Sequence, residues 1–130
     1  MLLADDHEVV RQGLAALLSE EEVLAIVGEA GNGREAVALA HQLHPDVVVM
    51  DASMPIMSGE EATRRIKQDL PGTRVVALSM SEDPEVRERI CAAGAESYVL
   101  KTAPASELFA AIRGGQSPSR AVDSCGAPAR

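Results

Sequence analysis

The chain has 130 residues, and with 46% hydrophobic and 25% charged residues its composition is that of a single globular domain. Its net charge of −8 argues against a nucleic-acid-binding surface, because such a surface has to neutralise phosphates. A divalent cation or a basic partner fits this charge better. Tyr98 and Phe109 are the only aromatic residues, so the predicted core consists of aliphatic side chains and methionine.

Apolar runs and helical patterns alternate from the first residue of the chain. Residues 1–4 predict a strand, and apolar residues at helical spacing predict a helix over 10–18. A second strand is predicted over 23–30 and a second helix over 36–43. Residues 46–50 contain a continuous β-branched run, which is typical of a strand covered on both faces.

The same alternation continues through the second half of the chain. A helix over 62–70 precedes an apolar strand over 74–79. Proline opens the next predicted helix, over 84–93, and glycine follows it. A fifth strand over 97–101 and a last helix over 107–113 complete the pattern.

Strands that alternate with helices predict an α/β fold, here a doubly wound, five-stranded parallel sheet with helices on both faces and right-handed crossovers. The predicted domain covers residues 1–113. From residue 114 the sequence is rich in Gly, Ser, Pro and Ala and has no apolar period. Residues 114–130 are therefore predicted to be a disordered tail or a truncated linker.

The two cysteines and the apolar runs bear on the cellular compartment. Cys91 and Cys125 share no motif, so we expect two free thiols in a reducing cytoplasm. No apolar run approaches the length of a membrane span, and the start of the chain has no signal-peptide pattern. The sequence predicts a cytoplasmic protein that makes no membrane contact.

Polar side chains end four of the predicted strands. Asp5 and Asp6 follow the first, Asp51 the third, Ser79 the fourth and Lys101 the fifth. In open α/β sheets, ligands bind beyond the carboxyl ends of the strands, so these residues predict one site. Each alone has an ordinary interpretation, such as a solvated acidic loop or a helix cap. Adjacent aspartates repel each other, so either they face water or a strongly positive group lies among them.

Four segments resemble the receiver domain of bacterial response regulators, in particular its NarL/FixJ-type subfamily. They are ADDHE (4–8), VVVMDASMPIMSG (47–59), VVALSMS (75–81) and AAGAESYVLK (92–101). The resemblance covers residues 1 to about 113. It implies the flavodoxin-like (CheY-like) strand order 2-1-3-4-5, which periodicity alone does not supply.

The resemblance also implies a function for the acidic residues. Asp51 is then the phosphorylation site and takes its phosphoryl group from a phosphohistidine of a sensor histidine kinase. Mg²⁺, or Mn²⁺ in its place, is expected on Asp6, Asp51 and the backbone carbonyl of Ser53, with Asp5 acting through a bound water. Such a dication would account for the adjacent aspartates. Lys101 would stabilise the phosphoryl oxygens by its positive charge.

Other residues take supporting roles by the same resemblance. Ser79 would offer its hydroxyl to the phosphoryl group, and Tyr98 would turn inward behind it as part of a switch. Pro55 and Gly59 would shape the loop after the phosphorylation site. His7 is not expected to bind the metal, because Mg²⁺ prefers oxygen ligands.

The family usually continues into a helix-turn-helix DNA-binding domain, and here the sequence stops. We expect no DNA binding by these 130 residues, because DNA would be bound only through a missing output domain. A phosphorylation-dependent homodimer is a further expectation. The family also implies no enzymatic activity beyond self-phosphorylation and autodephosphorylation.

Three alternatives stay open at this point. A phosphatase with an aspartyl nucleophile usually carries a second acid two residues later, where Ser53 stands here. A flavodoxin-like electron carrier would need aromatic residues to stack on a flavin. A stand-alone or degenerate receiver would act by protein–protein contact alone, which the complete set of strand-end residues argues against.

Overall fold

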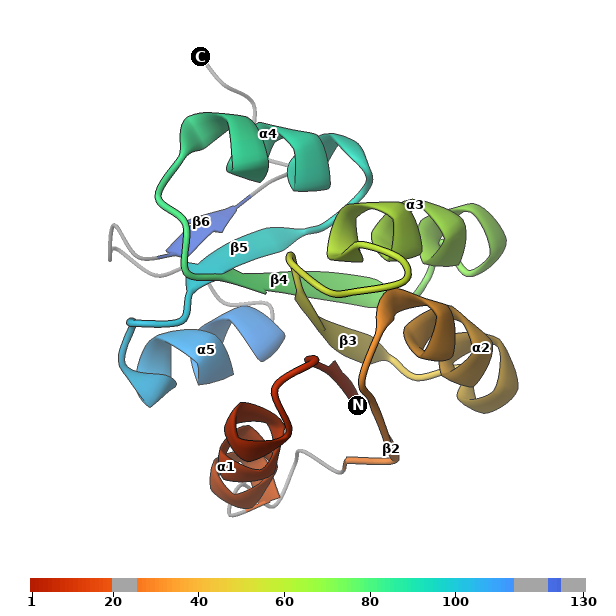
Figure 1. Ribbon diagram of the computed structural model, residues 1–130, viewed down its shortest axis with the longest axis horizontal. Coiled ribbons are helices and arrows are strands. Elements are labelled where there is room, and N and C mark those ends of the chain that lie inside the picture. Colours follow the sequence, from red (N-terminus) through yellow and green to blue (C-terminus); the bar gives the residue numbers. More distant parts are fainter. Residues whose placement is uncertain (20–25, 114–121, 125–130) are drawn as a thin grey trace.

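The computed structural model describes residues 1–19, 26–113 and 122–124. Its parallel strands have the order β2-β1-β3-β4-β5, and a short β6 pairs antiparallel with β5 (Figure 1). The strands are β1 (Leu2–Ala4), β2 (Gly28–Ala30), β3 (Val47–Asp51), β4 (Arg74–Ser79), β5 (Ser97–Leu100) and β6 (Val122–Ser124). The predicted doubly wound sheet with the order 2-1-3-4-5 is confirmed.

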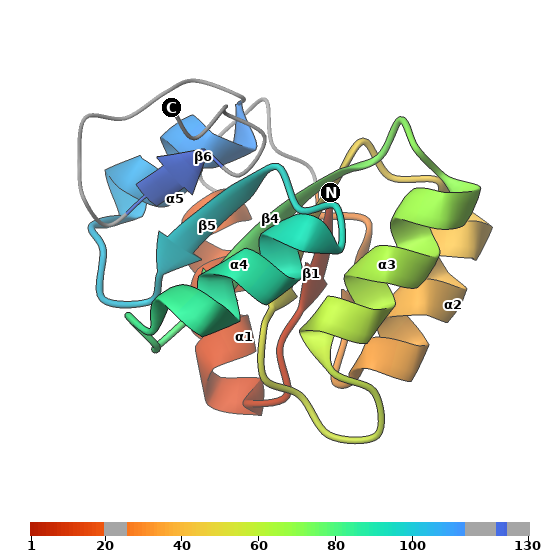
Figure 2. The same cartoon turned by 90° about the horizontal axis from the view of Figure 1, so that it is seen from above.

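Helices cover both faces of this sheet. They are α1 (Glu8–Ser19), α2 (Gly33–Leu43), α3 (Gly59–Asp69), α4 (Pro84–Ala92) and α5 (Ala105–Ile112). α1 and α5 lie on one face, and α2, α3 and α4 lie on the other (Figure 1). Figure 2 shows α2, α3 and α4 in a row along their face. Because the five central strands are parallel, their carboxyl ends lie at the same edge of the sheet.

The alternation of side chains along each strand divides the core in two. Val48 and Met50 of β3 pack with Ile66 of α3 on one face. Val47 and Val49 belong to the other core, which includes residues of α5. Both faces of β3 are buried, as its continuous apolar run predicts.

Side-chain caps begin three of the helices near the candidate site. Asn32, Ser58 and Asp83 each accept a hydrogen bond from a backbone N–H in the first turn of α2, α3 and α4. These caps satisfy backbone donors that a helix start otherwise leaves without a partner. They fix where the loops after β3 and β4 enter their helices.

Two elements differ from the sequence prediction. The predicted strand 23–30 is a strand only from Gly28, and its residues 23–25 lie outside the described part of the chain. Gly28 pairs with Leu2, and just before it the Val27 N–H donates to Met1 O at 2.9 Å. β6 lies in the segment 114–130, for which no strand was predicted, and the remainder of that segment is also outside the described residues.

The thiol of Cys91 is not free. Cys91 is disulfide-bonded, so the prediction of a free thiol is wrong for this residue, and Cys125 lies outside the described residues. Spacing along the sequence does not report distance in space, so it could not exclude a bridge. The argument for a reducing compartment from free thiols therefore no longer holds.

Candidate functional site

The parallel register brings the ends of β1, β3 and β5 together. Ala4 pairs with Met50, so Asp5 and Asp51 lie side by side at the same edge of the sheet. Lys101 follows β5 and reaches both carboxylates. Its Nζ lies 3.0 Å from Asp5 Oδ2 and donates a hydrogen bond of 3.1 Å to Asp51 Oδ2. One ammonium group thus serves two carboxylates.

Both of these carboxyl groups are buried. Asp5 is 0% exposed and Asp51 is 2% exposed. Burial first, and then the charge of Asp5, raise the pKa of Asp51 to about 6, although hydrogen bonds from the Ser53 N–H and from Lys101 act in the opposite direction. Burial alone would lower the pKa of Lys101, but the carboxylates of Asp5 and Asp51 outweigh it and raise that pKa. The site therefore holds more negative charge than Lys101 can balance.

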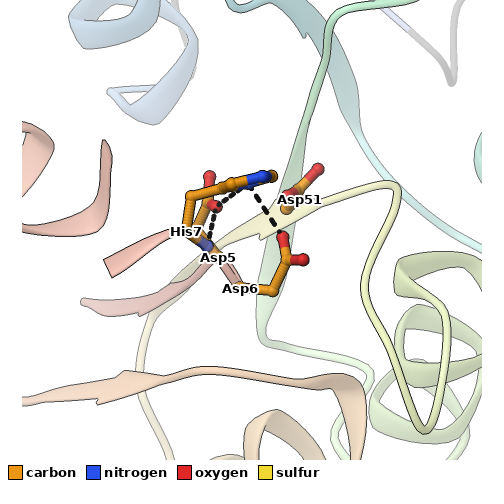
Figure 3. Close-up of side chains that lie close together, drawn as sticks. All are labelled: Asp5, Asp6, His7 and Asp51. Carbon is orange, nitrogen blue, oxygen red and sulfur yellow. Dashed lines mark hydrogen bonds and ion pairs between the residues drawn. The ribbon is translucent and has the colours of Figure 1, made fainter. Parts of the chain in front are cut away.

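Asp6 and His7 extend this acidic cluster toward solvent. Ligand atoms of Asp5, Asp6, His7 and Asp51 lie within 4.8 Å of one another, and Figure 3 shows these side chains gathered at the ends of β1 and β3. The Asp6 side chain is 25% exposed, and its Oδ1 lies 3.1 Å from His7 Nδ1. His7 itself is 68% exposed.

The donor set fits a hard divalent cation. Asp5 Oδ2 and Asp6 Oδ1 are buried, and each lies against one nitrogen, Lys101 Nζ at 3.0 Å and His7 Nδ1 at 3.1 Å. Buried carboxylates whose negative charge exceeds the positive charge beside them are costly unless a further cation neutralises them. Three carboxylates offer the oxygen ligands that Mg²⁺ prefers, whereas the imidazole of His7 is a ligand of softer metals.

The loop between β3 and α3 passes close to Asp51. The Ser53 N–H donates to Asp51 Oδ1 at 3.1 Å, and the Met57 N–H donates to Pro55 O at 2.7 Å. Gly59 donates to Ala52 O at 3.2 Å, and a Cβ at Gly59 would lie only 2.1 Å from Asp51 O. Only glycine allows α3 to begin this close to the end of β3.

Ser79 and Tyr98 are connected through the loop after β4. The Ser79 hydroxyl oxygen accepts a hydrogen bond from the Ser81 N–H at 3.0 Å. The Tyr98 hydroxyl donates to Ser81 O at 2.7 Å, and Tyr98 is 3% exposed. Tyr98 therefore lies inward, and Ser81 contacts both residues.

An open pocket of about 460 Å³ lies beside the cluster, and Ser53, Ser79, Ser81 and Arg89 are among the residues that line it. Ala52 and Ser53, which directly follow Asp51, place this pocket next to the carboxyl end of β3.

Sequence reasoning missed two residues near the site. Ser81 carries no sequence signal, because it acts through its backbone. Arg11 donates from Nη1 to the carbonyl of Asp5 at 2.7 Å. Its spacing of three and seven residues from Leu14 and Leu18 puts a charge on the predicted apolar face of α1, and that was the available signal.

Comparison with known proteins agrees with this architecture. The family profile of the response regulator receiver domain matches residues 1–113. Response regulator protein VraR of Staphylococcus epidermidis is 46% identical over 114 residues, which are 87% of this chain and 54% of that protein. The VraR protein of Staphylococcus aureus matches with the same identity and coverage.

Solved structures show the same similarity. A two-component response regulator of the LuxR family from Aurantimonas sp. SI85-9A1 gives a TM-score of 0.83 at 34% identity, covering 92% of this chain and 88% of that chain. The signal receiver domain of the response regulator NarL from Mycobacterium tuberculosis gives 0.83 at 30% identity, covering 87% and 91%.

The fold, the acidic edge and these matches define a signalling domain of the two-component class. The chain belongs to the response regulator receiver domain family, in its NarL/LuxR-type branch, and is a receiver domain of a two-component system. It spans about half the length of the curated relatives it matches, with 54% of VraR covered. Among the described residues, no helix is both long and apolar enough to cross a bilayer.

Proposed function

We propose that the chain is a phosphoacceptor receiver in which Asp51 takes a phosphoryl group from a phosphohistidine of a sensor histidine kinase. The observation that carries this proposal is the hydrogen bonding of the buried Asp51 carboxylate. Its Oδ1 accepts from the Ser53 N–H and its Oδ2 from Lys101 Nζ. With a pKa of about 6, this carboxyl group is mainly ionised at neutral pH, as a nucleophile must be.

In the proposed reaction an Asp51 oxygen attacks phosphorus, the oxygen–phosphorus bond forms, and the nitrogen–phosphorus bond to the donor histidine breaks. The donor imidazole leaves with the electron pair of that bond. Both the nucleophile and the phosphoryl group are anionic, so the step needs positive charge. Lys101 supplies one such charge from 3.1 Å, and Ser79 offers a hydroxyl from the end of β4.

Mg²⁺, with Mn²⁺ as a substitute, is the proposed cofactor. Asp6, Asp51 and the backbone carbonyl of Ser53 would bind it directly, and Asp5 would act through a bound water. The ion would supply charge that neutralises the phosphoryl oxygens. The ligand atoms within 4.8 Å of one another, and the excess of carboxylates over the single ammonium of Lys101, support this assignment.

Ser79 and Tyr98 are the proposed switch. Their contacts with Ser81 support a coupled movement, because a shift of the Ser79 hydroxyl toward the phosphoryl group would change the loop that holds the Tyr98 hydroxyl. Ser79→Ala should still bind Mg²⁺ but lose most of the amide chemical-shift changes that phosphorylation causes in the parent. Unchanged shifts in that variant would contradict the coupling.

The proposed output is regulation through protein contact. In a longer parent protein the domain would control transcription. The net charge of −8 supports the expectation that the chain itself binds no duplex DNA. Family membership supports a cytoplasmic location and the absence of a metabolic substrate. A phosphorylation-dependent homodimer is expected, and light scattering with and without beryllofluoride tests it.

Incubation with acetyl phosphate and Mg²⁺ tests the proposed phosphorylation. Intact mass should rise by one phosphoryl group in the parent and stay unchanged in Asp51→Asn or in excess EDTA. Asp69→Asn changes an exposed aspartate of α3 and is the matched control, expected to react like the parent. An adduct on Asp51→Asn of equal yield would refute Asp51 as the acceptor.

A further inference from the structure

Arg11 of α1 binds the backbone of the loop that carries Asp5 and Asp6. Its Nη1 donates to the backbone carbonyl of Asp5 at 2.7 Å, and its Nε donates to Glu29 Oε1 at 3.2 Å. The Arg11 backbone N–H also donates to the carbonyl of His7 at 2.8 Å. The arginine side chain is only 19% exposed. One residue of α1 thus fixes the loop at two carbonyls and ties it to β2.

The Arg11 guanidinium packs against the turn that follows β2. A Cβ at Gly31 would lie 3.4 Å from Arg11 Nη1, so the guanidinium packs directly against the backbone there. The N–H of Asp5 donates to the carbonyl of Ala30, which precedes Gly31, at 3.0 Å. The backbone of Asp5 is therefore held on its amino side by β2 and on its carbonyl side by Arg11.

The carbonyl of Asp5 and the N–H of Asp6 belong to one planar peptide unit. A hydrogen bond that fixes this carbonyl also fixes the rotation of that plane, and so the direction in which the Asp6 side chain leaves the backbone. Asp6 Oδ1 is buried and lies 3.1 Å from Nδ1 of the exposed His7 ring. The direction of the peptide plane sets the position from which the Asp6 carboxylate reaches the cluster.

We infer that Arg11 is a positioning residue for the cation site, which acts by locking the Asp5–Asp6 peptide so that the Asp6 carboxylate faces the cation. The inference rests on the proposed function, because it concerns the same site. Arg11 contacts neither a reacting atom nor a carboxylate of the cluster. It acts through the backbone, as the outer partners of metal ligands commonly do.

The charge of Arg11 and its hydrogen bond to Asp5 predict opposite changes in Mg²⁺ affinity when Arg11 is substituted. The positive charge of Arg11 repels a cation, so its removal alone would strengthen Mg²⁺ binding. Loss of the peptide lock would weaken it. Arg11→Lys separates the two effects, because lysine keeps the charge but lacks the planar fork that reaches Asp5 and Glu29 together.

The test measures the Mg²⁺ dissociation constant of the full chain by isothermal titration calorimetry. Arg11→Lys should weaken Mg²⁺ binding roughly tenfold, in line with other outer-shell changes. Arg11→Ala should also weaken binding, with part of the loss offset at low ionic strength. Glu29→Gln should have a smaller effect because the bond to Asp5 remains. With acetyl phosphate, Arg11→Lys should need more Mg²⁺ but reach nearly the parent rate at saturation.

Arg74 provides the matched control. Its guanidinium also donates to backbone carbonyls, at 2.6 Å to Ile112 and 2.7 Å to Ala111, but from the opposite end of the sheet. Arg74→Lys should lower stability to urea and leave Mg²⁺ affinity unchanged. If Arg74→Lys weakens Mg²⁺ binding as much as Arg11→Lys, the effect is general destabilisation and the inference is wrong.

The remaining outcomes also decide the question. Parent-like Mg²⁺ affinity in Arg11→Lys, or tighter binding in Arg11→Ala at all salt concentrations, would overturn the inference. If the unsubstituted chain binds no Mg²⁺, both this inference and the proposed cofactor are wrong. A parent that binds Mg²⁺ but is not phosphorylated overturns the proposed function alone, because affinity is measured without a phosphodonor.

Discussion

The two ends of the sheet treat buried charge in opposite ways. At the carboxyl ends of β1 and β3, three carboxylates gather beside one ammonium, that of Lys101, which lies 3.0 Å from Asp5 Oδ2 and 3.1 Å from Asp51 Oδ2. At the amino end of β4, the ammonium of Lys67 lies against an acid and backbone carbonyls instead. It donates to Glu96 Oε2 at 2.6 Å, to Thr73 O at 2.8 Å and to Pro71 O at 3.1 Å.

The partner of Lys67 is also fully used. Glu96 Oε1 accepts from the Val75 N–H at 2.8 Å, so one carboxylate joins α3 to the edge of the sheet. Charge and hydrogen bonds balance at this end, and they do not at the other. The amino end of the sheet is therefore built for stability. The carboxyl end carries an excess of negative charge that destabilises the fold, and a bound cation can neutralise it.

The largest expected loss of stability comes from removing the Lys67 ammonium at the amino end of the sheet. Lys67→Ala removes three hydrogen bonds and the stem that packs against Gly94, and it should lower the free energy of unfolding by about 3 kcal/mol. Urea denaturation measures this. Arg65→Ala, which breaks an exposed ion pair with Glu61 on the same helix, should cost less than about 1 kcal/mol. Equal losses of stability in the two variants would show that the Lys67 network contributes no more than an exposed ion pair.

Relieving the unbalanced end should stabilise the metal-free protein. The folded pKa of Asp51, about 6, lies above the ordinary value of 3.8, so ionisation destabilises the folded state. The protonated Asp51 carboxyl group therefore favours the folded state. This stabilisation is fully present below pH 4 and is lost as the pH rises through about 6. Asp51→Asn should therefore match the parent near pH 4 and be more stable by about 2 kcal/mol above pH 6.

Thermal or urea unfolding in EDTA at a series of pH values checks this prediction. Added Mg²⁺ should stabilise the parent more than Asp51→Asn, which reverses or removes the difference between them. A gap between the two proteins that does not change from pH 4 to pH 7 would show that the buried charge of Asp51 is not its cause.

A smaller effect is expected from the backbone of the loop after β3. Ile56 has a φ of 69°, a left-handed conformation that β-branched residues rarely adopt, and it is 71% exposed. Ile56→Asn should raise the free energy of unfolding by about 1 kcal/mol, because asparagine tolerates this conformation and little apolar burial is lost. Ile56→Val keeps the β-branch and is the control. Stabilisation by both substitutions alike would rule out backbone strain as the reason.

The sequence predicted the sheet order through family resemblance and the meeting of strand ends through topology. Parallel strands put their carboxyl ends at one edge, so Asp5, Asp51 and Lys101 had to converge once the strands were assigned. The contact between Lys67 and Glu96 was not predictable, because it joins residues 29 apart in sequence. The hydrogen bond from Arg11 to the Asp5 carbonyl likewise escaped, since a backbone acceptor carries no residue signature.

The smallest expected effect concerns an exposed ion pair between α2 and α3. His41 Nδ1 lies 2.8 Å from Val37 O, and its Nε2 lies 2.7 Å from Asp69 Oδ2. Both ring nitrogens face acceptors, which favours the doubly protonated ring. The backbone carbonyl of Val37 first, and then Asp69, raise the pKa of His41 above 6.5. The stabilisation is therefore complete below pH 6.5 and is lost as the pH rises through the raised pKa.

His41→Gln should remove this pH dependence, and the change should be less than about 0.5 kcal/mol because the pair is exposed and screened. Urea unfolding of the parent and the variant at pH 6 and pH 8 measures it, and Asp69→Asn should weaken the same dependence from the other side of the pair. High salt should weaken it further in the parent. If the parent lost no stability relative to His41→Gln between these pH values, the ion pair would contribute nothing, and the amino-end network of Lys67 would be the stronger candidate for holding α3 in place.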